Sequence, residues 1–397
     1  MKPGAIRGLV IWLITTLFLI YENLLNTMFG LVARDVGVDL AIDAVQLGVL
    51  AAAFVYAYGA MQVPVGVLFD RLDPRRLLTV AALACALGAL VFAHSTGVGQ
   101  AFVGRSLMGL GGALAYVGAS TLMAVWWPAW LGLMLGLAQF VDAIGSAVGQ
   151  PAMAALLEIT GWRQLHVAAA VAGATIALGM SLIVDRPAGF ALAANRRPLW
   201  PSIRRVVGKP ALWLAAVFAS GTIGTIFSYG VVWNVSLQEA FGNDLQRSAG
   251  VNAWLFVGFG GGAAVLGWLS GRRAPRRLLL VVPPAVSAVV IGLLVYLSRI
   301  DNPVIVDLAT AVVGFGCGSS VLAYELVALD EAPDQRGTAI GFVNAIAFFA
   351  ASGLQALHGL AADGGLADAR GILWVYPLIL AVSAAAGWQM AARGRSR

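Results

Sequence analysis

The sequence predicts an all-α membrane protein in which twelve transmembrane helices form two pseudo-symmetric bundles of six. Three observations predict this fold class: an apolar composition, twelve separate apolar runs, and a basic phrase that occurs once in each half. The chain is 60% hydrophobic and 11% charged, with a mean hydropathy of +0.86. Because a soluble domain has about 25% charged residues, this chain has too few polar residues to cover a surface that faces water.

Each apolar run is long enough to cross a bilayer, since a spanning helix needs about 20 predominantly apolar residues. Helices are expected because lipid offers no other partner to backbone N–H and C=O groups. The predicted spans are residues 8–33, 44–69, 76–95, 98–125, 130–157, 162–184, 210–238, 247–270, 276–298, 302–328, 336–361 and 370–392.

The distribution of lysine and arginine predicts the orientation, because cytoplasmic loops carry an excess of them. With the N-terminus inside, nineteen of the 25 basic residues fall on the inner side and five on the outer side, and Arg105 lies within a span. This bias predicts cytoplasmic termini and an even number of spans. We expect a multi-pass protein of the bacterial inner membrane. The net charge of +6 therefore reflects topology and does not indicate nucleic-acid binding.

The repeated phrase predicts an internal duplication. Residues 65–80 read VGVLFDRLDPRRLLTV and residues 266–281 read LGWLSGRRAPRRLLLV, with nine of sixteen positions identical. Each copy follows the second span of its half, so a repeat of six helices is the simplest account. We expect an N-terminal bundle at 1–184, a cytoplasmic linker at 185–209 and a C-terminal bundle at 210–397. Two parallel halves of this kind are a recognised transporter plan.

Four motifs then point to one family. Residues 66–76, GVLFDRLDPRR, are similar to the loop signature Gly-x-x-x-Asp-Arg-x-Gly-x-Arg-Arg, with aspartate at position 73 in place of glycine. Residues 105–113 are similar to the signature Arg-x-x-x-Gly-x-Gly-x-Ala of span four. Residues 136–151 are similar to the glycine-rich signature of span five, with the proline one place late. Residues 161–163 read Gly-Trp-Arg, which the family has after span five. On these motifs the chain resembles the major facilitator superfamily over nearly all of its length. The resemblance implies a monomer in which two bundles rock about a central site that is open to one side at a time.

The two copies of the phrase differ where the first has Asp70 and the second has Gly271. The resemblance implies that Asp70 faces the start of span eleven, at Arg336, where a helix N-terminus favours an acid by about 0.3–1 kcal/mol. We expect this contact to hold the cytoplasmic side closed; alternatively, Asp70 only orients the loop arginines, which also anchor the chain at the lipid interface. The candidate gating residues are Asp70, Arg71, Arg75, Arg76, Glu325 and Arg336.

Charged residues at bilayer depth mark the candidate coupling site in the first half. A charge there costs about 2.5–3.5 kcal/mol, so it usually faces a cavity or a partner. We expect Glu22 or Asp142 to bind a proton and Arg105 to pair with the ionised acid or with an anionic substrate; alternatively, the three are static and fasten the helices. The candidate coupling and substrate residues are Tyr21, Glu22, Asn26, Arg105 and Asp142.

The second half is poorer in charge at depth. Its candidate cavity residues, which alternatively only join helices, are Tyr229, Trp233, Asn234, Tyr324 and Asn344. Asp307 and His358 are expected at the outer mouth. Because no basic residue lies at full depth in this half, a neutral, zwitterionic or monoanionic solute fits better than a multiply charged anion.

The expected function is secondary active transport of a small organic solute, coupled to protons. An uncoupled facilitator and a drug-type proton antiporter remain open, as does a receptor or scaffold that has lost transport. A membrane enzyme is disfavoured because the sequence has no His-Glu-x-x-His, Gly-x-Ser-x-Gly or paired-cysteine motif. Cys85 and Cys317 are expected to be buried thiols. No cofactor or metal is expected, and the expected partners are the solute, protons and membrane lipids.

Overall fold

The computed structural model describes residues 3–127, 131–185, 204–271, 274–296, 302–331, 336–357 and 370–393. Twelve helices in these ranges are long and apolar enough to cross a membrane. They correspond one by one to the predicted spans, with shifted ends: the first helix continues past the predicted end at residue 33 as far as Asp39.

The first six spans are single helices. They are α1 (Pro3–Asp39), α2 (Ala44–Arg71), α3 (Pro74–Ala93), α4 (Val98–Trp126), α5 (Leu131–Thr160) and α6 (Trp162–Ile183).

Three spans of the second half are interrupted; in the twelfth, a turn at Trp374 separates the helical residues 370–373 from the last helix. The seventh span consists of α8 (Pro210–Ser228), the π-helix η2 (Tyr229–Trp233) and α9 (Asn234–Ala240), and the tenth consists of α12 (Pro303–Cys317) and α13 (Ser320–Asp330). The remaining helices are α10 (Leu245–Gly271), α11 (Arg276–Tyr296), α14 (Arg336–Ala356) and α17 (Val375–Arg393). A π-helical turn within an α-helix is frequent at functional sites.

Acidic caps explain where two helices begin. Asp43 accepts a hydrogen bond from the backbone N–H of Gln46 and forms a capping box at the start of α2. Asp73 accepts from the backbone N–H of Arg75 at 3.0 Å, directly before Pro74 at the start of α3. Aspartate before an N-terminal proline is a favourable helix start. This role accounts for Asp73 at the position where the loop signature has glycine.

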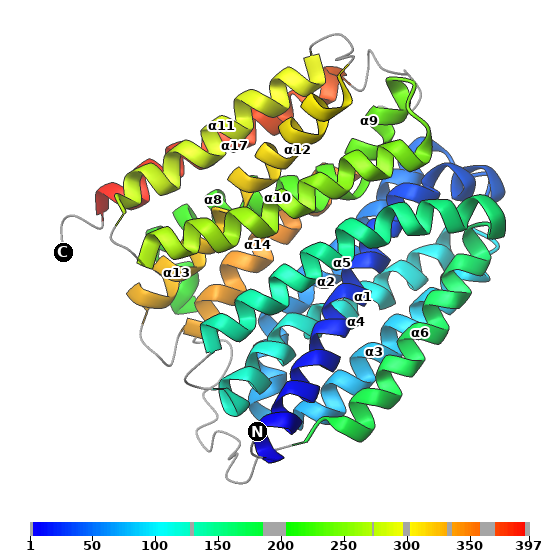
Figure 1. Ribbon diagram of the computed structural model, residues 1–397, viewed down its shortest axis with the longest axis horizontal. Coiled ribbons are helices and arrows are strands. Elements are labelled where there is room, and N and C mark those ends of the chain that lie inside the picture. Colours follow the sequence, from blue (N-terminus) through cyan, green and yellow to red (C-terminus); the bar gives the residue numbers. More distant parts are fainter. Residues whose placement is uncertain are drawn as a thin grey trace.

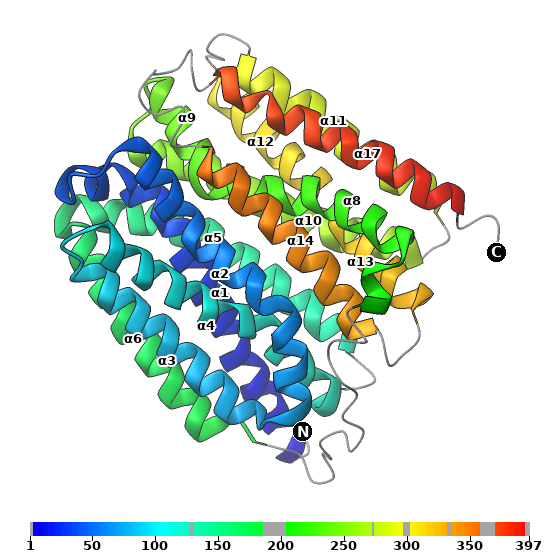
Figure 2. The same cartoon turned by 180° about the vertical axis from the view of Figure 1, so that it is seen from behind.

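The helices form two groups that lie side by side (Figures 1 and 2). In the first group α3 packs against α4 and α6, and α2 packs against α4; in the second, α10 packs against α12 and α11 against α17. Contacts between the groups run mainly along α2 with α14 and along α5 with α10. Most of the predicted linker at 185–209 lies outside the described residues, so the domain boundaries stay a prediction.

Both chain termini lie at the same end of the helices (Figure 1). We call this end the terminal face and the opposite end the far face. Toward the far face, α1 contacts η2. A Cβ added at Gly30 of α1 would overlap the backbone carbonyl oxygen of Val231, so only glycine permits this approach. The two groups are therefore in close backbone contact near the far face.

Candidate functional site

The two predicted acids of the first half lie close together at bilayer depth. Glu22 of α1 is only 8% exposed, and its carboxylate lies against α4, where a Cβ at Gly112 would be 3.1 Å from Oε2. Asp142 of α5 is half-buried and interacts electrostatically with Glu22. Among the residues that the structure describes, no lysine or arginine forms an ion pair with either acid.

Amide side chains surround these acids and keep free hydrogen-bonding capacity. Asn23 Nδ2 donates to Asp142 Oδ2 at 3.2 Å, while the other oxygen atoms of both side chains are buried without a partner. Asn26 lies one turn further along α1, is 1% exposed, and has no hydrogen bond from either Oδ1 or Nδ2. Because buried polar groups are normally satisfied, these atoms are available to a solute, a proton or water.

Arg105 does not join the acids. The side chain is 0% exposed and donates to three backbone carbonyls, those of Leu25, Leu50 and Ala51, at 3.3, 3.4 and 3.0 Å. Its guanidinium also lies over the ring of Phe29, 4.6 Å from the centroid. The expected pairing with Glu22 or Asp142 is absent, because the carbonyls of α1 and α2 take up the donors of Arg105. These contacts fasten α4 to α1 and α2.

Tyr21 also points away from the acids. Its hydroxyl donates to the carbonyl of Ala169 on α6 at 2.9 Å. Successive residues of a helix face different directions, so Tyr21 and Glu22 cannot both face the same partner. Tyr21 connects α1 to α6, and the structure gives it no contact with the candidate site.

The second half contributes a chain of neutral hydrogen bonds that reaches the first half. The hydroxyl of Tyr324 donates to Asn344 Oδ1 at 2.7 Å, and Asn344 Nδ2 donates to Gln62 Oε1 at 2.7 Å. Gln62 belongs to α2, so this chain links the two groups of helices on the side nearer the terminal face. We call Gln62, Asn344 and Tyr324 the terminal-side amide bridge.

A second chain links the groups nearer the far face. Asn234 Nδ2 donates to Asn252 Oδ1 at 2.9 Å, and Asn252 Nδ2 donates to Gln150 Oε1 at 2.6 Å. Asn252 also donates to the carbonyl of Gly230 in η2. We call Gln150, Asn252 and Asn234 the far-side amide bridge. In both bridges the glutamine Nε2 of the first half is buried without a partner.

Sequence reasoning missed three members of these bridges, namely Gln62, Gln150 and Asn252. A signal was present, since each is an amide within an apolar span. The other two candidate cavity residues of the second half contact residues of the same half. Trp233 Nε1 donates to the carbonyl of Leu354 at 3.1 Å, and the ring of Tyr229 packs edge-on against Tyr376.

The predicted latch lies outside what the structure describes, because the side chains of Asp70, Arg71 and Arg336 are not placed. The helices that would carry it do pack together: a Cβ at Gly341 of α14 would lie 3.2 Å from the carbonyl oxygen of Gln62 in α2. Since the two helices are antiparallel, their ends at residues 71 and 336 come to the same face. The contact itself stays a prediction.

The other candidate gating and mouth residues lie at the helix ends. Arg75 and Arg76 are exposed at the start of α3, and Glu325 lines a small cavity near the terminal face. Asp307 forms an ion pair with Arg247 at 2.8 Å toward the far face. His358 lies outside the described residues. Within the ranges that the structure describes, no three His, Cys, Asp or Glu side chains gather as metal ligands.

Comparison with known proteins gives the family. A sequence model described as Major Facilitator Superfamily matches residues 11–356. The 4-hydroxybenzoate transporter PcaK of Pseudomonas putida is 27% identical over 304 residues, which cover 67% of this chain and 67% of PcaK. The gallate transporter of Pseudomonas putida is 23% identical over 434 residues, which cover 100% of this chain and 94% of that protein.

The aligned region spans only 33%, 49% and 54% of the length of the first three curated relatives that match. Among solved structures, the inward-facing, occupied form of a bacterial homologue of the human lysosomal transporter Spinster is similar, with a TM-score of 0.75 and 16% identity. That similarity covers 99% of this chain and 98% of the other. At this identity it supports the fold alone. The family match covers most of the chain and the fold agrees with it, so this multi-pass membrane protein belongs to the Major Facilitator Superfamily.

Proposed function

We propose that the protein is a secondary active transporter that moves a small organic solute by alternating access, in exchange with or together with protons. Family membership supports transport in general and sets a membrane enzyme aside. The observation that carries proton coupling is the pair of acids at bilayer depth, the buried Glu22 and the half-buried Asp142, which have no basic partner among the described residues.

The physical argument starts from the cost of charge. An ionised carboxylate at the centre of a bilayer costs about 2.5–3.5 kcal/mol, and a nearby cation would offset that cost. Arg105 lies deep within α4, and three of its hydrogen bonds go to backbone carbonyls. Binding a proton removes the charge from Glu22, and opening to water allows its release. A site of this kind suits a carrier that must take up and release a proton once per cycle.

The solute that we propose is a hydroxylated aromatic acid, carried as a monoanion. An aromatic cluster lies across the two halves: Tyr58 packs against Phe348 with ring centroids 4.4 Å apart, and Phe348 packs against Phe227 at 4.8 Å. Such rings favour stacking with another ring. The unpartnered amide of Asn26 can bond a hydroxyl or carboxylate group. The names of the relatives PcaK and the gallate transporter point in the same direction.

For orientation, we propose that the terminal face is cytoplasmic and that the membrane is a bacterial inner membrane. The excess of lysine and arginine in the loops at that face supports this assignment. We propose that the protein acts as a monomer, because one chain supplies both groups of helices and both interfaces between them.

The test is solute-dependent proton movement in proteoliposomes that contain the purified protein and a pH-sensitive dye. The panel includes hydroxylated benzoates, aliphatic monocarboxylates, amino acids, sugars and cationic drugs. We expect hydroxylated benzoates to produce proton movement that Glu22→Gln abolishes. The matched control is Glu158→Gln, which removes an exposed acid at the far end of α5 and leaves the movement unchanged.

The other functions are distinct outcomes of this experiment. Uptake without proton movement identifies an uncoupled facilitator. Proton movement in response to cationic drugs alone identifies a drug antiporter. Binding of a solute with neither uptake nor proton movement identifies a receptor. Each of these results would contradict the proposal.

A further inference from the structure

The terminal-side amide bridge continues beyond Gln62 into the first half. Tyr58 lies one turn before Gln62 on α2, so the two side chains share a face of that helix. The Gln62 side chain interacts with the hydroxyl of Tyr58. Because Gln62 Oε1 accepts from Asn344, Nε2 is the atom left for this hydroxyl, and Nε2 has no hydrogen bond of regular geometry elsewhere. The next polar group after the bridge is therefore the hydroxyl of Tyr58.

The ring of Tyr58 is held firmly between helices. It packs against Phe348 of α14 with ring centroids 4.4 Å apart, and against Phe54 of its own helix at 6.2 Å. A Cβ at Gly59 would lie 3.1 Å from Phe348 Cβ, so α2 and α14 approach closely here. Tyr58 is only 6% exposed. Two ring contacts and a close helix approach therefore fix where the hydroxyl points.

Glu22 lies on the other side of this hydroxyl. Among the described titratable groups, Glu22 has the strongest electrostatic interaction with Tyr58. The packing agrees, because a Cβ at Gly112 of α4 would lie 3.1 Å from Glu22 Oε2 and 3.3 Å from Phe54 Cζ. The carboxylate and the Phe54 ring thus meet at one point on α4, and Tyr58 stacks on that ring. Tyr58 therefore stands between the acid and the terminal-side amide bridge.

The donors along this chain of side chains all point the same way. The hydroxyl of Tyr324 donates to Asn344, and Asn344 donates to Gln62. Gln62 Nε2 can donate to the hydroxyl oxygen of Tyr58, which leaves the Tyr58 O–H free to donate to the carboxylate of Glu22. Hydrogen bonds in such a series polarise one another. An ionised carboxylate at the end is a strong acceptor, so it stabilises the whole series.

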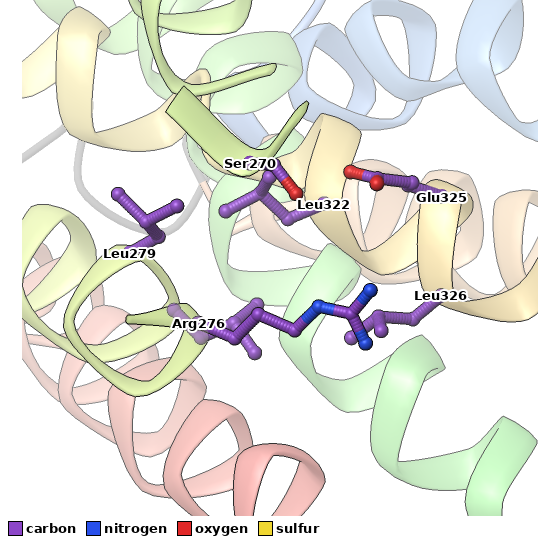
Figure 3. Close-up of a pocket in the computed structure, with 7 residues that line it drawn as sticks. Ser270, Arg276, Leu279, Leu322, Glu325 and Leu326 are labelled. Carbon is purple, nitrogen blue, oxygen red and sulfur yellow. The ribbon is translucent and has the colours of Figure 1, made fainter. Parts of the chain in front are cut away.

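The other titratable groups near this series do not supply a cation. The groups that face Glu22 come from three helices, namely Asp142 of α5, Tyr58 of α2 and Cys85 of α3. On α4, Arg105 donates to backbone carbonyls, and Tyr116 interacts with Tyr324. Glu325, next to Tyr324 on α13, lines a separate small cavity between helix ends (Figure 3). Among the described residues no basic side chain pairs with Glu22, so hydrogen bonds stabilise its ionised form.

We propose that Tyr58 is a positioning residue that links the protonation of Glu22 to closure of the terminal face. The inference rests on the proposed function, in which Glu22 takes up the proton. With Glu22 ionised, the Tyr58 O–H donates to the carboxylate, and the series of donors holds α2 against α14. With Glu22 protonated, the neutral carboxyl group accepts more weakly and donates to the Tyr58 oxygen, where it competes with Gln62. Proton binding thus loosens the terminal-side amide bridge and favours opening at that face.

The test measures opening of the terminal face as labelling of Ala345→Cys by a thiol reagent in the solubilised full-length protein. Ala345 is 7% exposed and its carbonyl lies against Gly59 of α2, so the new thiol is reached when α2 and α14 separate. Leu72→Cys, at a residue that is 47% exposed, corrects for the effect of pH on thiol reactivity. Labelling is expected to rise about fivefold from alkaline to mildly acidic pH, since a hydrogen bond to a charged group is worth roughly twice a neutral one.

Four variants in the Ala345→Cys background assign the response to residues. Tyr58→Phe keeps the ring contacts and removes the hydroxyl, and we expect labelling that no longer depends on pH and stays at the high level seen in acid. Glu22→Gln is expected to behave in the same way. Tyr56→Phe is the matched control, because it removes an exposed hydroxyl from the same helix and is expected to keep the full response to pH. Gln62→Leu breaks the bridge directly and marks the level of labelling without it.

Four results would overturn the proposal. These are a Tyr58→Phe variant that keeps the pH response while Glu22→Gln loses it, a Tyr56→Phe variant that loses the response as well, labelling that falls in acid, and a wild-type background that does not respond to pH. The proposed function fails by a different result, namely the absence of solute-dependent proton movement in wild-type proteoliposomes. Because the labelling needs neither solute nor transport, the two failures are distinguishable.

Discussion

The two halves of the molecule share a fold but differ in what they place at bilayer depth. The first half has the acids Glu22 and Asp142 and the buried Arg105. The second half places neutral groups there, and its amides Asn252 and Asn344 reach across to glutamines of the first half. The difference supports the proposed division of tasks, in which the first half holds the groups that take up protons and the second half holds the two halves together.

The amide bridges suit an interface that has to open on either side, because each of their hydrogen bonds is weak. A side-chain hydrogen bond within a membrane protein contributes about 0.6 kcal/mol on average. Neutral bridges on the sides of both the terminal and the far face therefore allow either side to open at a small cost in free energy.

The most direct test of the difference between the halves is to place an acid at bilayer depth in the second half. Asn344→Asp keeps the shape of the side chain but introduces a carboxylate beside Gln62. We expect it to destabilise the protein by about 2.5–3.5 kcal/mol, the cost of a charge at this depth. The measurement is the midpoint of thermal unfolding in detergent. Asn302→Asp is the control, since Asn302 caps α12 and aspartate caps equally well; equal shifts for the two variants would refute the division between the halves.

Replacement of Arg105 tests whether the charged half contains a structural cation. Arg105→Met leaves three backbone carbonyls without their donor, and we expect a loss of about 1–3 kcal/mol in unfolding free energy. Arg105→Lys retains a charge and is expected to recover part of this loss. If Arg105→Met leaves stability unchanged and instead stops proton movement, Arg105 belongs to the coupling site.

The contact between Gly30 and Val231 tests how closely the halves must approach. Gly30→Ala places a Cβ on the carbonyl oxygen of Val231, and overpacking of this kind costs typically about 1–3 kcal/mol. The expected result is a large loss of transport with a folded protein, measured as solute uptake. Gly250→Ala on α10 is the matched control, because a Cβ there meets no atom within 4 Å. Uptake that survives Gly30→Ala would show that the cycle does not need this contact.

The smallest effects are expected from single bridge residues. Gln150→Leu removes one hydrogen bond from the far-side amide bridge, and about 0.6 kcal/mol corresponds to roughly a threefold shift in a two-state equilibrium. The readout is labelling of Ser146→Cys on α5 by an impermeant reagent added at the far face. Both native cysteines are buried, so their background is low. Gln150→Leu is expected to raise labelling, whereas Gln62→Leu is not; the reverse order would contradict the assignment of the two bridges.

The fold was predictable from the sequence because length and hydropathy decide which segments span a membrane. The position of the acids was predictable for a related reason, since a charge in an apolar span is conspicuous at the level of single residues. The partner of Arg105 was not predictable. Its choice of the Leu25, Leu50 and Ala51 carbonyls depends on how closely α1, α2 and α4 approach, which no single segment specifies.

The amide bridges were harder to predict from the sequence than the partners of Arg105. Gln150 and Asn252 are 102 positions apart and belong to different halves. Each was visible as an amide within an apolar span, but a polar side chain in a span fits a pore, a packing contact or an interface equally well. Only the pairing of α5 with α10 brings the two together. Asp73 shows the opposite case, in which a departure from a family signature has a local explanation as a helix cap.

The central claim is that the acids of the first half couple protons to the solute. The most direct measurement compares two assays on Glu22→Gln and wild-type proteoliposomes: accumulation of a hydroxylated benzoate driven by a pH gradient, and exchange of labelled for unlabelled solute at equal pH. The account predicts that Glu22→Gln exchanges solute but no longer accumulates it, while the wild type does both. Accumulation by Glu22→Gln at the wild-type level would contradict the account.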